Sequence, residues 1–243
     1  MGIVVNGVID IGNTEVKFAA FRGDELLDQG KTGYGDWDEL RQWAEAWQVE
    51  AWILSSVQKT PSSDELGFLF KELNAETPLP VTNRYGTPST LGKDRIAGIC
   101  GAALLFPKKA VLVIDAGTCI TYDFMTAQQE YLGGNITPGI HMRLKAMHQF
   151  TGRLPQPDWS PIDRFYGQNT QDSLLSGVAE GVLGEAEHLI AQYRAEFGDL
   201  QVLCCGGDAS FFEKRLKMNI FAAPNLVLFG LNHILRYNQA LHA

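Results

Sequence analysis

The 243-residue sequence lacks any apolar run long enough to span a bilayer, so it predicts no membrane helix. Its first residues also lack the basic region and the long apolar stretch of a secretory signal peptide, and we therefore expect a cytoplasmic protein. Low-complexity segments and long linkers are absent too. With 45% hydrophobic and 20% charged residues, the chain has the composition of an ordinary globular protein with a sizeable core.

A surplus of basic residues is missing as well. The chain has 20 Lys and Arg against 28 Asp and Glu, which gives a formal net charge of −8. Proteins that bind nucleic acid normally carry a basic surplus or a basic stripe. We therefore expect no nucleic-acid partner.

Cysteine is scarce, and its positions do not predict a zinc site. The four cysteines are Cys100, Cys119, Cys204 and Cys205, and each lies in an apolar run without the spacing of zinc ligands. Reduced thiols in a cytoplasmic protein are the simplest interpretation.

The sequence does contain an apolar strand that ends abruptly in polar residues. Residues 8–14 read Val-Ile-Asp-Ile-Gly-Asn-Thr, a pattern typical of a buried strand that opens into a tight turn. Backbone N–H groups in such a turn, with Asn13 and Thr14, can hold phosphate oxygens, and Asp10 can hold a cation directly or through water. An ordinary turn, in which Asp10 and Thr14 bond their own backbone, is the competing interpretation.

The same stretch recurs in the second half of the chain. Residues 113–118 repeat the valine, isoleucine, aspartate and glycine of residues 8–13 at equal offsets, and a strand-like run follows each copy. This recurrence predicts a duplicated domain, with residues 1–109 as the first lobe and 110–243 as the second. Two such loops facing each other would hold a polyphosphate from both sides.

Periodicity and turn residues predict the remaining elements. Strands are expected at residues 3–11, 16–21, 25–32, 51–57, 80–84, 110–117, 120–125, 131–137 and 202–205. Helices are expected at residues 36–47, 62–73, 94–106, 140–150, 171–197 and 225–241. The tryptophan stripe of the first helix, which includes Trp37 and Trp43, favours a core face over a ligand site.

A second polar segment, residues 85–95, ends in Asp94 and Arg95 at the start of an apolar helix. A carboxylate is favoured there by the helix dipole, so simple capping explains an isolated Asp94 equally well. Arg95, however, can grip a carboxylate through two hydrogen bonds. A base beside a carboxylate-binding group suits a small acidic substrate that carries a hydroxyl.

Together these features resemble a known family. The two Asp-x-Gly loops are similar to the phosphate-binding loops of the sugar kinase, Hsp70 and actin superfamily. Within it the chain resembles type III pantothenate kinase, because the family's motifs occur in order over nearly the whole sequence. They are residues 10–14 followed by Lys17, then residues 92–95, 115–118, 133–139, 169–170 with 176–177, and 206–208.

The resemblance implies both a fold and an activity. The implied fold is α/β, with two duplicated actin-like ATPase (ribonuclease H-like) lobes, each a mixed sheet flanked by helices, and an ATP cleft between them. The implied activity is the phosphorylation of pantothenate by ATP, the first step of coenzyme A biosynthesis. A homodimer is implied, with Mg²⁺ accompanying ATP and with K⁺ or NH₄⁺ as a monovalent cation.

The resemblance also implies roles for individual residues. The ATP-binding set is Asp10, Ile11, Gly12, Asn13, Thr14, Glu15, Val16, Lys17 and Thr118. The pantothenate-binding set is Tyr85, Gly92, Lys93, Asp94, Arg95 and Thr170, with Asp94 as the proton acceptor. Asp115 matches the family's potassium ligand.

Two positions depart from the family's pattern. Lys93 stands where a small or apolar residue is usual, and Cys119 stands where alanine is more usual. Both are neighbours of key residues and replace none of them. Two alternatives to the kinase remain: a nucleotide-binding transcriptional accessory protein without turnover, which the intact Asp94 argues against, and another phosphotransferase of the superfamily, which residues 92–95 argue against.

Overall fold

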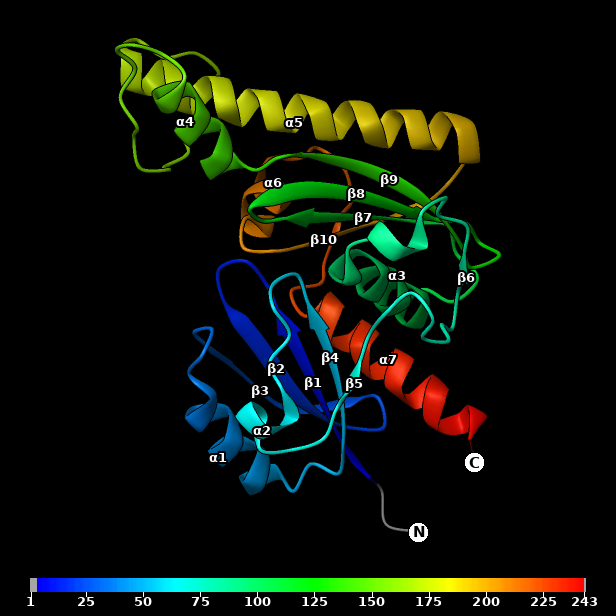
Figure 1. Ribbon diagram of the computed structural model, residues 1–243. Coiled ribbons are helices and arrows are strands. Elements are labelled where there is room, and N and C mark those ends of the chain that lie inside the picture. Colours follow the sequence, from blue (N-terminus) through cyan, green and yellow to red (C-terminus); the bar gives the residue numbers. More distant parts are fainter. Residues whose placement is uncertain (1–3, 243) are drawn as a thin grey trace. The chain divides into compact units, whose positions relative to one another are not determined.

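The computed structural model describes residues 4–242 (Figure 1), and the chain divides into two compact units. The first unit comprises the chain up to Lys108, Ala127–Leu132, and the segment from Asn225 onward. The second comprises Lys109–Thr126 and Gly133–Pro224. The last helix therefore groups with the amino-terminal half. The division into two domains at residues 109 and 110 stays a prediction.

The first unit is built on a mixed five-stranded sheet with the order β3-β2-β1-β4-β5. Its strands are β1 (Val5–Ile11), β2 (Val16–Arg22), β3 (Glu25–Thr32), β4 (Ala51–Ser56) and β5 (Lys71–Glu72). Short turns make β1, β2 and β3 antiparallel, whereas β4 follows a helical crossover and pairs with β1 in parallel. The parallel register places Asp10 opposite Ser55.

The second unit repeats this topology, with the order β9-β8-β7-β10-β11. Its strands are β7 (Val111–Ala116), β8 (Cys119–Met125), β9 (Glu130–Pro138), β10 (Gln201–Cys205) and β11 (Phe221–Ala222). Again the first two strands are antiparallel and the fourth is parallel to the first, with Asp115 opposite Cys205. The short β6 (Thr82–Asn83) pairs with Glu130 and Tyr131 at the start of β9, a stretch that groups with the first unit. The predicted duplication and the α/β fold of two mixed sheets are confirmed.

Helices cover the first sheet. They are α1 (Trp37–Trp47), α2 (Ser63–Leu66), α3 (Lys93–Leu105) and α7 (Leu226–Leu241), and a single 3₁₀ turn, η1 (Pro88–Thr90), precedes α3. Trp37, Leu40 and Ala44 of α1 are buried in one core with residues of β1, β2 and β4, so the tryptophan stripe is a core face. Helices α3 and α7 pack against each other, and α7 also contacts β1 and β4.

Three helices belong to the second unit: α4 (Ile140–Gln149), α5 (Thr170–Phe197) and α6 (Ala209–Arg215). Figure 1 shows α5 running along the strands β7, β8 and β9. Alternate residues of β7 and β8, such as Ile114 and Tyr122, share one buried core with Val182 of α5 and Phe212 of α6. This core fixes the ends of β7 and β10, where the polar residues begin.

The predicted helix at residues 62–73 is wrong beyond its first turn. Helix α2 ends at Leu66 because Gly67 adopts a left-handed conformation with φ of +80° and caps it. After Gly67 the burial alternates, since Phe68 and Phe70 are partly buried while Leu69 is 83% exposed. That period of two is typical of extended chain, and the segment continues into β5. The strand predicted at residues 80–84 is reduced to Thr82–Asn83.

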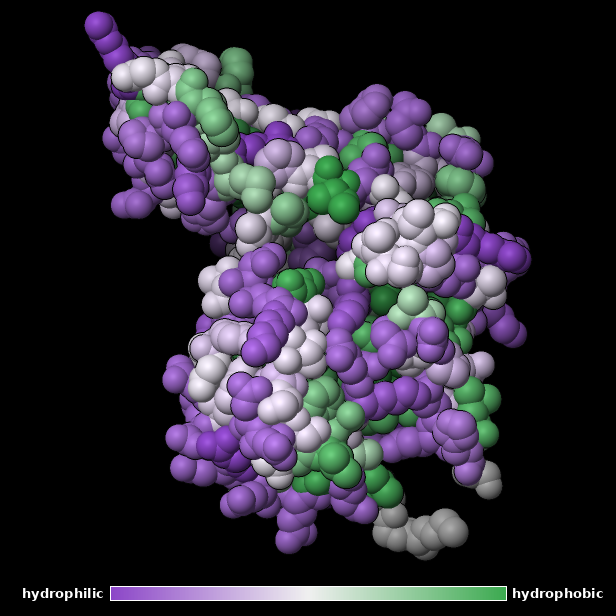
Figure 2. Space-filling view, in the orientation of Figure 1, coloured by the Kyte–Doolittle hydropathy of each residue, from purple (hydrophilic) through white to green (hydrophobic). Residues whose placement is uncertain are grey.

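The visible surface is mostly hydrophilic (Figure 2). Figure 2 shows hydrophilic residues over most of the visible face, with apolar residues scattered among them in small patches. Across the part of the chain that the structure describes, no helix has the length and apolar character needed to cross a membrane.

Candidate functional site

The first polar loop closes a tight turn between β1 and β2. The Gly12 amide donates to the Glu15 carbonyl at 3.1 Å, and the Gln58 side chain donates from Nε2 to the Gly12 carbonyl at 2.6 Å. Asn13 and Thr14 are exposed at the tip of the turn. Hydrogen bonds therefore fix the backbone of the loop, while the polar side chains at its tip are accessible to a ligand.

Asp10 lies at the base of this loop and is partly buried. Ser55 Oγ, on the adjacent strand β4, donates to Asp10 Oδ1 at 2.5 Å. Burial raises the pKa of Asp10 to about 6, with a further increase from the negative charge of Asp94, while the Ser55 hydrogen bond and Lys17 act in the opposite direction. A carboxylate in such surroundings gains from a nearby cation.

The acceptor segment predicted at residues 92–95 forms the start of α3. Gly92 occupies the N-cap position, and Asp94 lies in the first turn, where its Oδ1 accepts a hydrogen bond from the Arg95 amide at 2.9 Å. The charge of Asp94 acts on the pKa of Asp10, and both residues belong to the first unit. The first polar loop and the predicted acceptor segment therefore interact electrostatically.

Arg95 is held by aromatic rings. Its side chain is buried, with 7% of the residue exposed, and its guanidinium carbon lies 5.6 Å from the centroid of the Tyr85 ring. Tyr85 in turn stacks on the fully buried Tyr131, with centroids 6.0 Å apart and an interplanar angle of 12°. A guanidinium over a ring face is stabilised electrostatically, so this stack orients the cation of Arg95.

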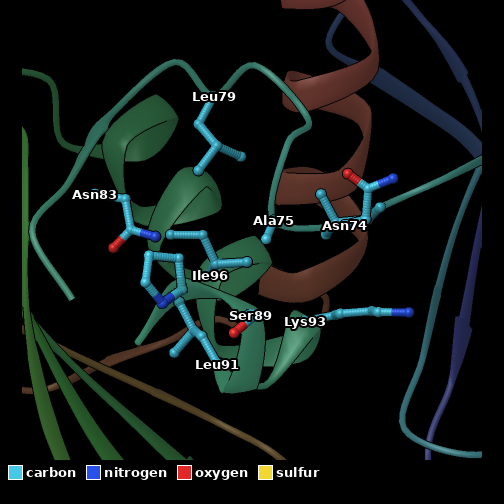
Figure 3. Close-up of a pocket in the computed structure, with 10 residues that line it drawn as sticks. Asn74, Ala75, Leu79, Asn83, Ser89, Leu91, Lys93 and Ile96 are labelled. Atoms are coloured by element: carbon cyan, nitrogen blue, oxygen red, sulfur yellow. The ribbon is translucent and has the colours of Figure 1, made fainter. Parts of the chain in front are cut away.

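A small cavity lies beside the acceptor segment (Figure 3). Its volume is about 120 Å³, and its lining includes Leu79, Asn83, Leu91 and Ile96. Lys93 also borders it, but Figure 3 shows the Lys93 side chain extending away from Leu91 and Ile96. The start of α3 therefore has open space on one side.

The second polar loop, at the end of β7, belongs to the second unit. The Gly139 amide donates to the Thr118 carbonyl at 3.1 Å, and the Asp208 amide donates to the Ala116 carbonyl at 2.9 Å. Gly206, with φ of +90°, lies so close to this loop that a Cβ there would be 2.5 Å from Asp115 Oδ1. The predicted motifs at residues 115–118, 133–139 and 206–208 thus meet around Asp115, and Thr118 is exposed.

Thr170 is the first residue of α5 and is exposed. The side chain of Asn169, at the N-cap, accepts a hydrogen bond from the Asp172 amide at 2.9 Å, which fixes the beginning of the helix. Thr170 belongs to the second unit, whereas the other residues predicted to bind the acceptor belong to the first.

Several residues that support the site were not predicted. Ser55, Gln58, Glu72 and Tyr131 contact Asp10, Gly12, Lys93 and Tyr85 respectively. For Ser55 a signal existed, because a serine pair ends the strand that a parallel sheet places beside β1. The roles of Gln58, Glu72 and Tyr131 depend on long-range contacts that no local sequence pattern predicts.

Metal ligation by the usual clusters is not evident. Within residues 4–242, no group of three His, Cys, Asp or Glu is placed to hold a metal ion. A cation would therefore have to share its coordination with backbone carbonyls, substrate oxygens or water.

Comparison with known proteins identifies the family to which the chain is similar. Residues 8–192 match a family model described as type III pantothenate kinase. A type III pantothenate kinase of Christiangramia forsetii is 40% identical over 243 residues, covering 97% of this chain and 99% of its own. One from Phocaeicola vulgatus is 41% identical over 242 residues, covering 98% and 100%.

Solved structures agree on the fold. A conserved putative Baf family transcriptional activator from Campylobacter jejuni matches with a TM-score of 0.64 and 22% identity, over 96% of this chain and 99% of its own. A glucokinase from an Antarctic psychrotroph matches with a TM-score of 0.52 and 12% identity, over 96% and 99%. These likenesses show the actin-like sugar-kinase fold. The family model and the sequence relatives establish that the chain belongs to the type III pantothenate kinase family.

Proposed function

We propose that the protein transfers a phosphoryl group from ATP to pantothenate and forms 4′-phosphopantothenate, the first step of coenzyme A biosynthesis. The observation that carries the proposal is the electrostatic interaction of Asp94 with Asp10, because it couples a predicted acceptor base to a predicted phosphate loop in one unit. Phosphoryl transfer depends mainly on positioning and charge neutralisation, and such a pair of groups serves both.

The ATP side is assigned to both polar loops. In this proposal the turn after β1 holds phosphate oxygens through its backbone N–H groups and the side chains of Asn13 and Thr14, as Thr118 does from the second unit. Lys17, on β2, adds positive charge near Asp10. The full set is Asp10, Ile11, Gly12, Asn13, Thr14, Glu15, Val16, Lys17 and Thr118.

The acceptor side is assigned to the start of α3. Asp94 orients the primary hydroxyl of pantothenate and accepts its proton late in the transfer, because an aspartate is a weak base at neutral pH. Arg95, oriented by Tyr85, neutralises the pantothenate carboxylate. Gly92, Lys93 and Thr170 complete the proposed acceptor set.

The residues present fit two kinds of cation. Burial raises the pKa of Asp10, and Mg²⁺ bound with ATP would favour its ionised form. Burial raises the pKa of Cys204 to about 12, and the negative charge of Asp115 adds to this effect. In this proposal Asp115, at the end of β7, and backbone carbonyls hold a large monovalent cation, K⁺ or NH₄⁺. Bound cations neutralise the charge of the triphosphate.

The competing function, a transcriptional accessory protein without turnover, is not favoured. The relatives at 40% and 41% identity are named as kinases, whereas the likeness to the Campylobacter protein, at 22% identity, concerns the fold alone. We further propose a homodimer in the cytoplasm, where the four cysteines, which form no disulfide among the residues that the structure describes, stay reduced.

A coupled assay tests the function directly. Purified protein with ATP, Mg²⁺ and pantothenate should release ADP in proportion to the 4′-phosphopantothenate formed, and no ADP should form when pantothenate is left out. Product identity by mass spectrometry separates phosphorylation from simple ATP hydrolysis. ADP release that does not depend on pantothenate would contradict the proposal. Sedimentation velocity tests the dimer.

A further inference from the structure

The start of α3 lacks a side-chain cap and borders a cavity. Gly92, at the N-cap, has no side chain with which to cap the helix, and the preceding residues 86–90 are exposed. The cavity of about 120 Å³ removes packing from one side of Leu91 and Ile96 (Figure 3). Asp94 must be placed accurately for phosphoryl transfer, so a contact on Lys93 that acts together with the Arg95–Tyr85 stack would help to fix this segment.

Lys93 provides that contact. Its Nζ lies 2.5 Å from Glu72 Oε1, and the Thr60 hydroxyl donates to the same oxygen at 3.0 Å. Burial opposes ionisation of Glu72, but the hydrogen bonds from Lys93 and Thr60 outweigh it and hold the pKa of this carboxyl below its ordinary value. The carboxylate is therefore fixed by two donors and directed at Lys93.

Glu72 is itself anchored to the sheet. It lies on β5 opposite Leu54 of β4, and the next amide, of Leu73, donates to the Leu54 carbonyl at 2.8 Å. The residue after Leu54 is Ser55, which holds Asp10. The chain of contacts from Lys93 through Glu72 to β4 thus ends beside the carboxylate of the phosphate loop.

We propose that the Lys93–Glu72 ion pair positions Asp94 relative to Asp10 and so sets the geometry of phosphoryl transfer. The Lys93 side chain acts through its neighbour Asp94, while its backbone remains part of the acceptor segment. This inference rests on the proposed kinase function. A displacement of about 1 Å in a reacting group costs up to about 10²-fold in rate, so the pair should act mainly on kcat.

The test compares variants that break the pair with one that breaks an unrelated pair. Lys93→Met and Glu72→Gln should each lower kcat about tenfold and change KM for ATP less than about twofold. The double variant should be no worse than either single one, because both remove the same contact. Lys93→Arg, which can still pair with Glu72, should keep most of the wild-type kcat. Arg236→Met removes an ion pair with Asp24 in the same unit and should keep kcat.

Two kinetic outcomes would overturn the proposal. If Lys93→Met loses activity while Glu72→Gln keeps it, Lys93 acts on a substrate without help from Glu72. If both variants keep kcat and only the melting temperature falls, the pair is merely structural.

Hydrogen exchange separates this inference from the kinase function, since it needs no turnover. Amides of residues 91–97 should exchange faster in Lys93→Met and Glu72→Gln than in wild type and in Arg236→Met, and unchanged exchange would contradict the proposal. If the wild type fails to phosphorylate pantothenate, the proposed kinase function is contradicted independently of the ion pair. The exchange data then still decide whether the pair fixes the segment.

Discussion

Ser55 lies directly opposite Asp10 on the neighbouring parallel strand and donates a hydrogen bond to its carboxylate at 2.5 Å. The duplicated unit places Cys205 opposite Asp115 in the same register. The two loops therefore share the same strand register, but the residue opposite the aspartate is a serine in the first unit and a cysteine in the second. In the first unit a hydroxyl favours the ionised acid, which suits a role close to phosphate and cation.

Ser55→Ala should move the acid limb of activity to higher pH. If ionised Asp10 is required, kcat/KM for ATP falls as the pH drops below about 6, the pKa of Asp10. Loss of the Ser55 hydrogen bond raises that pKa, and we expect a shift of about one pH unit. Ser56→Ala, whose hydroxyl bonds the Gln58 backbone, is the control and should leave the limb in place. If the acid limb of the pH profile stays in place in Ser55→Ala, a group other than Asp10 causes the loss of activity at low pH.

Asp10→Asn should stabilise the fold while it abolishes most activity. The folded-state pKa of Asp10 is raised, so its ionisation opposes folding above about pH 6, and the penalty disappears as the pH falls to the unfolded value of 3.8. Asparagine cannot ionise but keeps an oxygen for Ser55. At pH 7.5 we expect a gain of about 1 kcal/mol, or about 2–4 °C in melting temperature. The gain should vanish near pH 4, and an equal gain at both pH values would contradict this origin.

Asp94→Asn should remove most turnover and leave ATP binding near that of the wild type. A well-placed base contributes about 10²- to 10⁴-fold in rate. Asp38→Asn is a suitable control, because Asp38 lies in the first turn of α1 as Asp94 lies in the first turn of α3, but is exposed and outside the proposed site. Turnover above about a tenth of wild type, in a variant folded by circular dichroism, would refute the role of base.

Arg95→Lys should mainly raise the KM for pantothenate. An ammonium group lacks the planar fork that grips a carboxylate, and it stacks less well on Tyr85. We expect an increase of about tenfold from the loss of one charge-assisted hydrogen bond. Arg84→Lys, at an exposed pair with Glu130, should change KM little. A large drop in melting temperature with an unchanged KM would instead make Arg95 a structural residue.

The sequence predicted the fold well where a pattern was local or repeated. The recurrence of residues 8–13 at 113–118 predicted the duplication, and the two sheets have the same strand order. The prediction failed at residues 67–73, where Gly67 ends α2 and the burial alternates along an extended segment. Apolar residues in a short run fit either period, and only the glycine distinguished them.

For the site, the sequence indicated the chemical groups but not what holds them. Asp10 and Asp94 lie far apart in the chain, and their electrostatic interaction follows from sheet topology and from the placement of α3. Ser55, Glu72 and Tyr131 act through partners 45, 21 and 46 residues away, respectively Asp10, Lys93 and Tyr85. Such contacts arise from tertiary packing, which local periodicity does not encode.

The last prediction concerns the monovalent cation. Asp115 lies where three segments of the second unit meet, and its charge contributes to the raised pKa of Cys204. In the proposed function Asp115 contributes to ATP binding, and a carboxylate near a triphosphate would repel it unless a cation intervenes. Mg²⁺ prefers rigid octahedral coordination by phosphate and water, so it leaves a larger, irregular site of carboxylate and carbonyl oxygens to K⁺ or NH₄⁺.

Activity should therefore depend on K⁺ or NH₄⁺ even when Mg²⁺ and ATP saturate, and Asp115→Asn should weaken that dependence together with activity. The variant removes the charge of Asp115 and keeps its shape. The measurement is a titration of potassium chloride into an assay free of Na⁺ and NH₄⁺ at constant ionic strength, because screening alone alters the binding of charged substrates. Asp199→Asn, in the turn before β10, removes one charge from the same unit and serves as control. Full activity of the wild type without either cation would contradict the assignment of Asp115 as a cation ligand. An ionised Asp115 repels the triphosphate, and a bound cation is expected to cancel that repulsion.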